Sequence, residues 1–284
     1  MIVVSVKSFG DFVIAFRAVL EAQGGPPERR SALLTGSHLR ELALALDAPR
    51  RTELQFIDTG EGSQVPALFD MRRRGALASL ASAARLRAAC APYAVRGPFL
   101  FDLLGSRERF IAGGAAAVAL PAAPNIYAAY RLAFGQRARG LTPGPERAGS
   151  GPGQVLVVPG SRLPSKVIPP EVIASICRQL EANGCEPLVV RLEGETFESP
   201  AGVAERLLER SFKALTKAVS GASLVVSADS LAAHLAELQS VGVFVVSPRP
   251  NPYWLPPEAF AGGGHAVFES IGSLSAWVAR RLCN

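Results

Sequence analysis

Leu224–Ala236 reads LVVSADSLAAHLA, a short apolar run followed by an Ala- and Leu-rich segment. The apolar run is typical of a buried β-strand, and the segment after it is typical of an α-helix. Asp229 and Ser230 lie at the junction, where the unpaired backbone N–H groups of a helix start can bind an anion. His234 follows one helical turn later. These side chains indicate either a ligand site or an ordinary N-cap followed by a half-buried histidine.

Length and composition indicate a folded protein with two domains. The chain has 284 residues, of which 49% are hydrophobic and 19% charged, which is typical of packed globular domains. Residues 1–148 hold 19 Lys and Arg against 12 Asp and Glu, whereas residues 149–284 hold 11 against 12. The basic first half indicates an acidic acceptor, an anionic membrane surface or a solvated basic face. No nucleic-acid-binding motif accompanies the charge, so we expect no nucleic-acid partner.

The cysteines and histidines indicate no metal site. The four cysteines lack C-x-x-C spacing and the three histidines are scattered, so no zinc pattern is present. Reduced thiols are typical of the cytoplasm. The first residues form a strand-like run without a basic leader, and the apolar run 111–124 is too short to span a bilayer. We therefore expect a cytoplasmic protein, with peripheral contact at the inner membrane left open.

The first half alternates strand and helix patterns, which is typical of an α/β domain with a parallel sheet. We expect strands over 2–6, 31–35, 54–58, 94–95 and 99–103, and helices over 11–20, 39–46, 77–89 and 124–134. The turn Lys7-Ser8-Phe9-Gly10-Asp11 follows the first strand. Ligands in such sheets bind at the carboxyl ends of strands, so this turn is a candidate site. Asp11 is either a helix cap or a general base.

A Gly- and Pro-rich stretch, 141–153, is the predicted linker, and we place the domain boundary between residues 148 and 149. The second half then repeats the alternation. We expect strands over 154–158, 187–192, 224–228 and 243–246, and helices over 170–183, 203–210, 212–220, 231–236 and 271–282. The two predicted domains are thus residues 1–148 and residues 149–284.

Polar loops follow four of these strands, so a parallel sheet would gather them at one edge. The loops are 160–166, 193–195, 229–234 and 248–254. Their cations suit phosphates, their carboxylates suit ribose hydroxyls, and the helix start suits an oxyanion. The sequence therefore predicts a nucleotide or sugar-nucleotide site. Neither G-x-G-x-x-G nor G-x-x-x-x-G-K-[ST] is present, which argues against a standard dinucleotide fold or a P-loop.

Three blocks in this order resemble glycosyltransferase family 9, the ADP-heptose:lipopolysaccharide heptosyltransferases. They are the turn ending in Gly10-Asp11, the loop Pro159-Gly160-Ser161-Arg162 with Lys166, and Asp229-Ser230 with His234. The resemblance implies a GT-B architecture, in which two Rossmann-like α/β domains face across a cleft. The first domain would bind the acceptor and the second the nucleotide-sugar.

The resemblance also implies an activity: inverting, metal-independent transfer of a heptose-like sugar from a nucleotide diphosphate sugar to a hydroxyl of a glycan or small-molecule acceptor. We further expect an ADP-sugar as the donor, an acidic acceptor and no cofactor. We also expect a monomer with a role in lipopolysaccharide biosynthesis. Asp11 would be the general base and Lys166 the second catalytic residue. The implied donor-binding residues are Gly160, Ser161, Arg162, Glu195, Asp229, Ser230 and His234, and the acceptor-side residues are Lys7 and Gly10. Glu193 is an alternative to Glu195 at the ribose.

Two positions depart from the family pattern: Leu231 stands where the family has glycine, and Ile168 where it has tryptophan. Two other functions therefore stay open. One is a non-catalytic sugar-nucleotide-binding or assembly protein of the same fold, and the other is a GT-B-type sugar-nucleotide epimerase.

Overall fold

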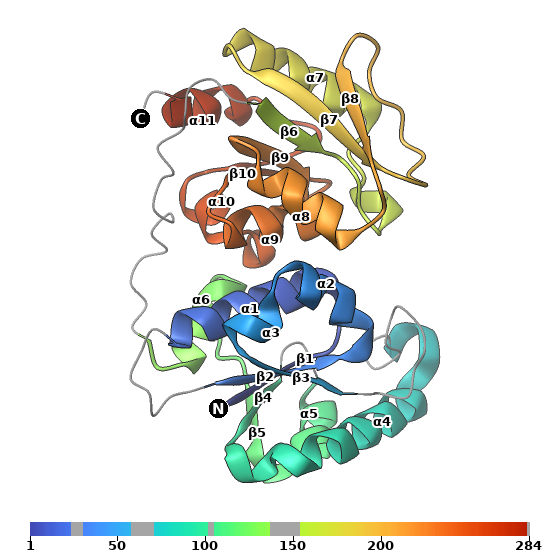
Figure 1. Cartoon of the computed structure of the whole chain (residues 1–284), viewed down its shortest axis with the longest axis vertical. Helices are drawn as coiled ribbons and strands as arrows, with labels where there is room; N and C mark the ends of the chain where they lie inside the picture. The colour runs from blue at the N-terminus through green and yellow to red at the C-terminus, as the bar shows by residue number, and fades with distance from the viewer. Residues whose placement is uncertain (24–30, 58–70, 102–104, 137–153, 283–284) are drawn as a thin grey trace. The chain divides into compact units, whose positions relative to one another are not determined.

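The computed structural model describes residues 1–23, 31–57, 71–101, 105–136 and 154–282, and side chains 71–76 and 78–79 are excluded from the description (Figure 1). The chain divides into two compact units. The first contains Met1–Ala123 and Ala129–Arg137, and the second contains Pro124–Ala128 and Ala138–Asn284. The predicted linker, and the predicted boundary between residues 148 and 149, lie outside the described residues and stay predictions.

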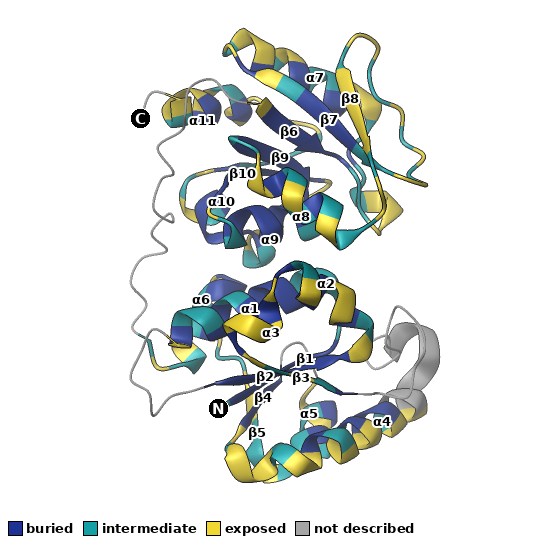
Figure 2. Cartoon of the chain, viewed as in Figure 1, coloured by how far each residue is buried: buried dark blue, intermediate teal, exposed yellow. Residues whose placement is uncertain are grey.

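The first unit is built on a five-stranded sheet in the order β3-β2-β1-β4-β5, with every pair parallel. Its strands are β1 (Ile2–Ser5), β2 (Ala32–Gly36), β3 (Glu53–Ile57), β4 (Phe99–Phe101) and β5 (Ala117–Ala119). The central strands β1 and β2 are buried along their whole length (Figure 2). Continuous apolar runs form such strands because helices cover both faces of a parallel sheet.

Helices of the first unit lie on the two faces of this sheet, with α1 on one face and α4 and α5 on the other (Figure 1). They are α1 (Phe9–Gln23), α2 (Arg40–Ala45), α3 (Ala48–Arg51), α4 (Met71–Cys90), α5 (Ser106–Gly113) and α6 (Ile126–Ala133). Helix α6 is shared, because residues 129–133 belong to the first unit and residues 126–128 to the second. Leu86 and Cys90 of α4 and Ala112 of α5 pack with β1 and β4 in one core cluster. The cluster explains why α4 keeps an apolar stripe although Arg85 and Arg87 are exposed.

One prediction for the first half is wrong, and two elements of it were not predicted. The strand predicted over 94–95 is wrong, because Ala91–Arg96 forms a 3₁₀-helix that begins with a proline in its first turn. Helix α5 and strand β5 were not predicted at all. Strand β5 lies in the Gly- and Ala-rich stretch 112–119, and α5 has only eight residues, so neither shows a clear periodicity.

The second unit contains a six-stranded parallel sheet in the order β11-β10-β9-β6-β7-β8. Its strands are β6 (Gln154–Val158), β7 (Glu186–Leu192), β8 (Ala204–Leu208), β9 (Leu224–Ala228), β10 (Gly242–Ser247) and β11 (His265–Val267). Its helices are α7 (Pro170–Ala182), α8 (Phe212–Ser220), α9 (Leu231–Leu238), α10 (Pro257–Ala261) and α11 (Ser273–Leu282). The four strands predicted for this half are confirmed, whereas β11 and α10 were not predicted.

The helix predicted over 203–210 is wrong, because its central residues form the edge strand β8. Ala, Glu, Leu and Arg favour a helix locally, and four of the five β8 residues are exposed, so no buried strand pattern is visible. Pairing with β7, from Ala204 opposite Leu188 to Leu208 opposite Leu192, overrides that preference.

The core of the second unit lies between the sheet and helices α7 and α11. Ile173, Ile176 and Leu180 line the buried face of α7, and Trp277 of α11 is 1% exposed. The Trp277 ring meets Phe244 of β10 edge-on, with ring centroids 5.4 Å apart. Both units are thus α/β layers around a parallel sheet, which confirms the fold class predicted for each half. No helix in the described part of the chain is long and apolar enough to cross a membrane.

Trp277 carries a prediction about stability. Trp277→Ala should lower the free energy of unfolding of the second unit by about 3–5 kcal/mol, because it leaves a cavity beside Phe244. Urea unfolding followed by far-UV circular dichroism measures the change. Leu207→Ala is the control, since that side chain is 53% exposed on β8. Equal unfolding midpoints for the two variants would contradict this account of the core.

Candidate functional site

The carboxyl ends of β6 and β9 lie side by side and define the candidate site of the second unit. The two strands pair in parallel register up to Val158 and Ser227. The loop after β6 and the junction after β9 therefore start from neighbouring positions. Strand β7 lies on the other side of β6, and β10 on the other side of β9. The prediction that the loops following these strands share one edge of the sheet is confirmed.

An ion pair joins the two loops. Lys166, at the end of the 3₁₀-helix Pro164–Lys166, places its Nζ 2.7 Å from Oδ2 of Asp229. Asp229 is held from the other side, because its backbone N–H donates to the carbonyl oxygen of Val246 over 3.2 Å. The Asp229 side chain is 9% exposed and that of Lys166 30%. The carboxylate thus fixes the lysine, while the partly exposed ammonium keeps donors that an anionic ligand can use.

The start of α9 lies next to this ion pair. Ser230 is the N-cap residue of α9, and its side chain makes no capping hydrogen bond. A helix start whose cap side chain is not engaged leaves its first N–H groups for another acceptor. Leu231, the first residue of the helix, is half-buried. Together with Lys166, this arrangement can bind an anion such as a phosphate.

His234 lies in the interior of the same helix and is 6% exposed. Its Nδ1 is 2.9 Å from the hydroxyl oxygen of Tyr127, and the two rings are tilted by 37°. Burial lowers the pKa of His234 to about 4; the Asp229 carboxylate opposes this shift and the Lys166 ammonium adds to it. The imidazole is therefore neutral at physiological pH. Tyr127 was not among the predicted site residues, because nothing in its local sequence connects it to a residue 107 positions later.

Glu195 is brought to the loop that follows β6. Its Oε2 accepts a hydrogen bond of 2.8 Å from the backbone N–H of Leu192. A Cβ atom on Gly160 would lie only 2.1 Å from Glu195 Oε1, so the carboxylate lies directly against this glycine. The alternative, Glu193, is exposed and offers its carbonyl oxygen to Arg210. Of the two carboxylates, Glu195 is therefore the one that adjoins the candidate site.

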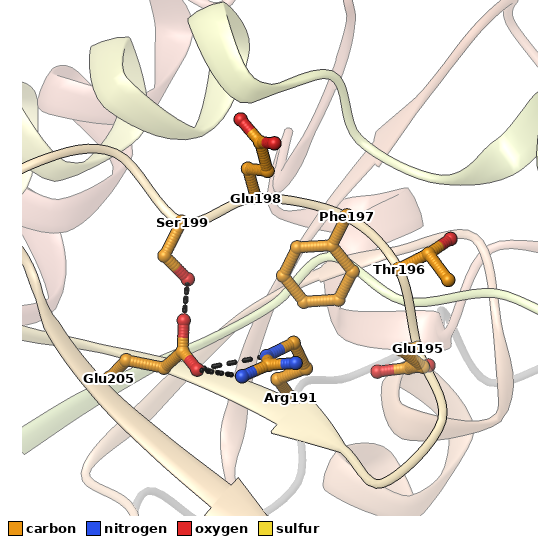
Figure 3. A pocket seen from close by; sticks show the side chains of 7 residues that line it. All are labelled: Arg191, Glu195, Thr196, Phe197, Glu198, Ser199 and Glu205. Atoms are coloured by element: carbon orange, nitrogen blue, oxygen red, sulfur yellow. Dashed lines mark hydrogen bonds and ion pairs between the residues drawn. The ribbon is translucent and has the colours of Figure 1, made fainter.

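A pocket of about 440 Å³ lies beside Glu195 (Figure 3). It is lined by Arg191, Glu195, Thr196, Phe197, Glu198, Ser199 and Glu205. Hydrogen bonds from Ser199 and Arg191 converge on Glu205, as Figure 3 shows, and lower the pKa of its carboxyl. Three carboxylates and one guanidinium make the lining acidic. Such a lining suits hydroxyl groups or a cationic group better than a phosphate.

The other predicted donor-side residues have less defined contacts. The hydroxyl oxygen of Ser161 accepts a hydrogen bond of 3.3 Å from the backbone N–H of Leu163, and Arg162 is exposed. Both follow Gly160, so they stand on the same loop as Lys166. No three His, Cys, Asp or Glu side chains among the described residues are grouped so as to hold a metal ion.

In the first unit, Asp11 lies in the first turn of α1. The helix begins at Phe9, two residues before the predicted start, because Ser8 can cap it. The Ser8 hydroxyl donates to Asp11 Oδ2 over 2.7 Å, and its oxygen is 3.4 Å from the Asp11 backbone nitrogen. Gly10 lies within this turn, and Lys7 precedes it. The serine hydroxyl thus holds the Asp11 carboxylate at the start of α1.

His38 was not predicted as a site residue, but the structure brings it to the same turn. It follows β2, the neighbour of β1, within the 3₁₀-helix Ser37–Leu39. Burial lowers its pKa, and a hydrogen bond with the backbone of Lys7 opposes this shift. His38 contacts Lys7 because β1 and β2 are neighbours in the sheet, and separate sequence motifs do not indicate that order. Asp11 and Lys166 belong to different units, so the cleft predicted between them stays a prediction.

Several solved structures of glycosyltransferases are similar to this fold, whereas no protein-family model and no curated protein matches the sequence. E. coli heptosyltransferase WaaC with ADP matches with a TM-score of 0.57 at 14% identity, covering 100% of this chain and 99% of that chain. E. coli ADP-heptose lipopolysaccharide heptosyltransferase II matches with a TM-score of 0.51 at 14% identity, with coverages of 99% and 98%. A family 9 glycosyltransferase from Veillonella parvula gives 0.54 at 15%, with coverages of 94% and 85%.

These similarities confirm that the chain has the fold that the resemblance to glycosyltransferase family 9 implied. Fold and function are separate questions, because one fold hosts many activities. The activity therefore depends on the side chains of the site.

The burial of His234 predicts how the free energy of unfolding depends on pH. The folded state holds its pKa near 4, below the value of about 6.5 in an unfolded chain. Between these values the unfolded chain binds a proton that the folded chain does not. The free energy of unfolding should therefore fall as the pH falls from about 6.5 to 4. His234→Gln should remove part of this slope.

Denaturant unfolding at a series of pH values measures the slope for each protein. His265→Gln removes a histidine of β11 in the same unit and is the matched control. The account of His234 is wrong if the His234→Gln variant shows the same pH dependence as the unchanged protein.

Proposed function

We propose that the protein is an inverting, metal-independent glycosyltransferase that uses a nucleotide diphosphate sugar. The observation that carries this proposal is the Lys166–Asp229 pair beside the start of α9. It offers an ammonium group and backbone N–H donors at one point, which suits the two phosphates of such a donor. Glu195 adjoins the same loop and suits the ribose hydroxyls. A cation and a helix start can stabilise the diphosphate without a divalent ion.

The fold neighbours support an ADP-sugar as the donor. WaaC was solved with ADP and also with ADP-2-deoxy-2-fluoro heptose, the latter structure matching with a TM-score of 0.56 at 15% identity. We infer by analogy that the donor carries ADP and a heptose-like sugar. The analogy also supports a role in lipopolysaccharide biosynthesis.

Asp11 is the proposed general base. It would take the proton from the acceptor hydroxyl while that oxygen attacks the anomeric carbon of the donor sugar. The bond between this carbon and the diphosphate oxygen breaks, and the electron pair leaves with the diphosphate. Attack opposite to the leaving group inverts the anomeric centre. Lys166 and the N–H groups of α9 would stabilise the charge that develops on the leaving diphosphate.

The acceptor is proposed from the charge of the first half. Its excess of Lys and Arg suits an acidic glycan or an acidic small molecule. The same charge suits an anionic bilayer, so peripheral contact with the inner membrane from the cytoplasm belongs to this proposal. We further propose that the protein acts as a monomer and needs no cofactor.

A second candidate function is sugar-nucleotide binding without transfer. Leu231 stands at the first position of α9, where a side chain reduces the room for a diphosphate. A protein that only binds the sugar-nucleotide does not need a general base. Substitution of Asp11 therefore distinguishes binding from transfer. A GT-B-type epimerase is a weaker third candidate; it would convert the nucleotide-sugar without any acceptor.

Lys166 carries the prediction about donor binding. Lys166→Ala should weaken ADP binding about ten- to a hundredfold, because a charge-assisted contact to phosphate is lost. Isothermal titration calorimetry with ADP measures the loss. Lys213→Ala on α8 is the matched control, since that lysine is exposed in the same unit. Unchanged ADP affinity in the Lys166→Ala variant would refute the phosphate assignment.

Asp11 carries the prediction about transfer. Asp11→Ala should reduce transfer by about 10²–10⁴-fold and leave donor binding nearly unchanged, because only proton removal is lost. A thermal-shift screen of ADP-, GDP-, UDP- and dTDP-sugars first selects the donor. Release of the nucleoside diphosphate from that donor, with a panel of glycan acceptors, then measures transfer. Asp47→Asn changes an exposed carboxylate of the same unit and serves as the control. Turnover that survives Asp11→Ala would exclude this mechanism.

A further inference from the structure

A short segment before α6 is anchored in the second unit. Asn125 is fully buried, and its side-chain amide donates to the carbonyl oxygens of Leu255 over 2.8 Å and Pro252 over 3.2 Å. Its Oδ1 accepts a 2.9 Å hydrogen bond from the backbone N–H of Tyr127. Asn125 therefore caps α6 and fixes the backbone at Tyr127 at the same time.

The hydrogen bonds of Asn125 place the Tyr127 hydroxyl next to His234. The Tyr127 side chain is 4% exposed, and its hydroxyl oxygen lies 2.9 Å from His234 Nδ1. Both groups are buried, so losing the hydrogen bond would leave polar atoms without access to bulk water. At neutral pH a tyrosine hydroxyl is a donor, and a neutral imidazole accepts at the nitrogen that carries no proton. Donation from Tyr127 to Nδ1 places the histidine proton on Nε2.

The Nε2–H tautomer of His234 also suits an anionic ligand. Asp229 and Lys166 are the charged groups that act on its imidazole. A neutral imidazole with its proton on Nε2 presents an N–H to anionic oxygens, whereas the other tautomer would present a lone pair and repel them. Among the described residues, the hydrogen bond of the His234 ring is the one at Nδ1, so an Nε2–H keeps its donor for a ligand.

We propose that Tyr127 is a positioning residue that holds His234 in the Nε2–H tautomer, so that His234 donates a hydrogen bond to the donor diphosphate beside Lys166. This inference rests on the proposed function, because it takes the Lys166–Asp229 site to bind a nucleoside diphosphate. Tyr127 itself touches no reacting atom. It acts through His234, and Asn125 acts through Tyr127.

The first test reads the tautomer without any ligand. Nitrogen-15 NMR of the imidazole side chains distinguishes Nε2–H from Nδ1–H, and the chain has only three histidines to assign. The His234→Gln variant identifies the signal of His234. We expect the Nε2–H form in the unchanged protein and a mixture of tautomers in the Tyr127→Phe variant. A single Nε2–H form in Tyr127→Phe, or an Nδ1–H form in the unchanged protein, would overturn the inference.

The second test uses ADP as the probe, with adenosine as the ligand that lacks phosphate. Tyr127→Phe should weaken ADP binding by about fivefold to tenfold and leave adenosine binding unchanged. Tyr130→Phe is the matched control, because it removes a buried hydroxyl from the same helix. Far-UV circular dichroism and the unfolding midpoint show whether either variant has lost its fold.

The two tests separate the inference from the proposed function. If the unchanged protein binds no ADP, the proposed function fails, and the NMR experiment still shows whether Tyr127 sets the tautomer. If the unchanged protein binds ADP and Tyr127→Phe binds it equally well, the proposed function survives and the inference is wrong.

Discussion

The ion pair between Lys166 and Asp229 is the interaction on which the candidate site depends, and it exists because β6 and β9 are neighbours in parallel register. Val158 near the end of β6 lies opposite Ser227 near the end of β9, so a lysine from one following loop meets a carboxylate from the other. The carboxylate fixes the ammonium group next to the start of α9. Without that register, Lys166 and Asp229 would lie in two loops that do not meet.

A second constraint comes from the segment at 124–128, which precedes the second unit in sequence by many residues and yet packs within it. Asn125 satisfies two carbonyl oxygens of the Pro252–Leu255 turn and caps α6. Its burial without other partners would be costly, so the three hydrogen bonds define one position for the segment. Tyr127 and His234 meet as a result, and a neutral histidine is held beside a charged pair.

β1, β6 and β9 were predicted because their apolar runs are continuous, as burial on both faces requires. β8 was predicted as a helix because its exposed edge position removes that pattern and leaves only local helix propensity. Lys166, Asp229 and Glu195 were proposed as site residues from motif order and their placement after strands. Tyr127 and His38 were missed, since their contacts depend on distant segments.

The sequence by itself determined the α/β class, most strands, and the set of polar loops, because burial and helix starts leave local patterns in the chain. Only the tertiary structure decided which polar groups meet. It paired Lys166 with Asp229, chose Glu195 over Glu193 as the carboxylate at Gly160, and brought Tyr127 to His234. The physical reason is that hydrogen bonds and ion pairs act over a few ångströms, and strand order and register alone bring remote residues within that distance.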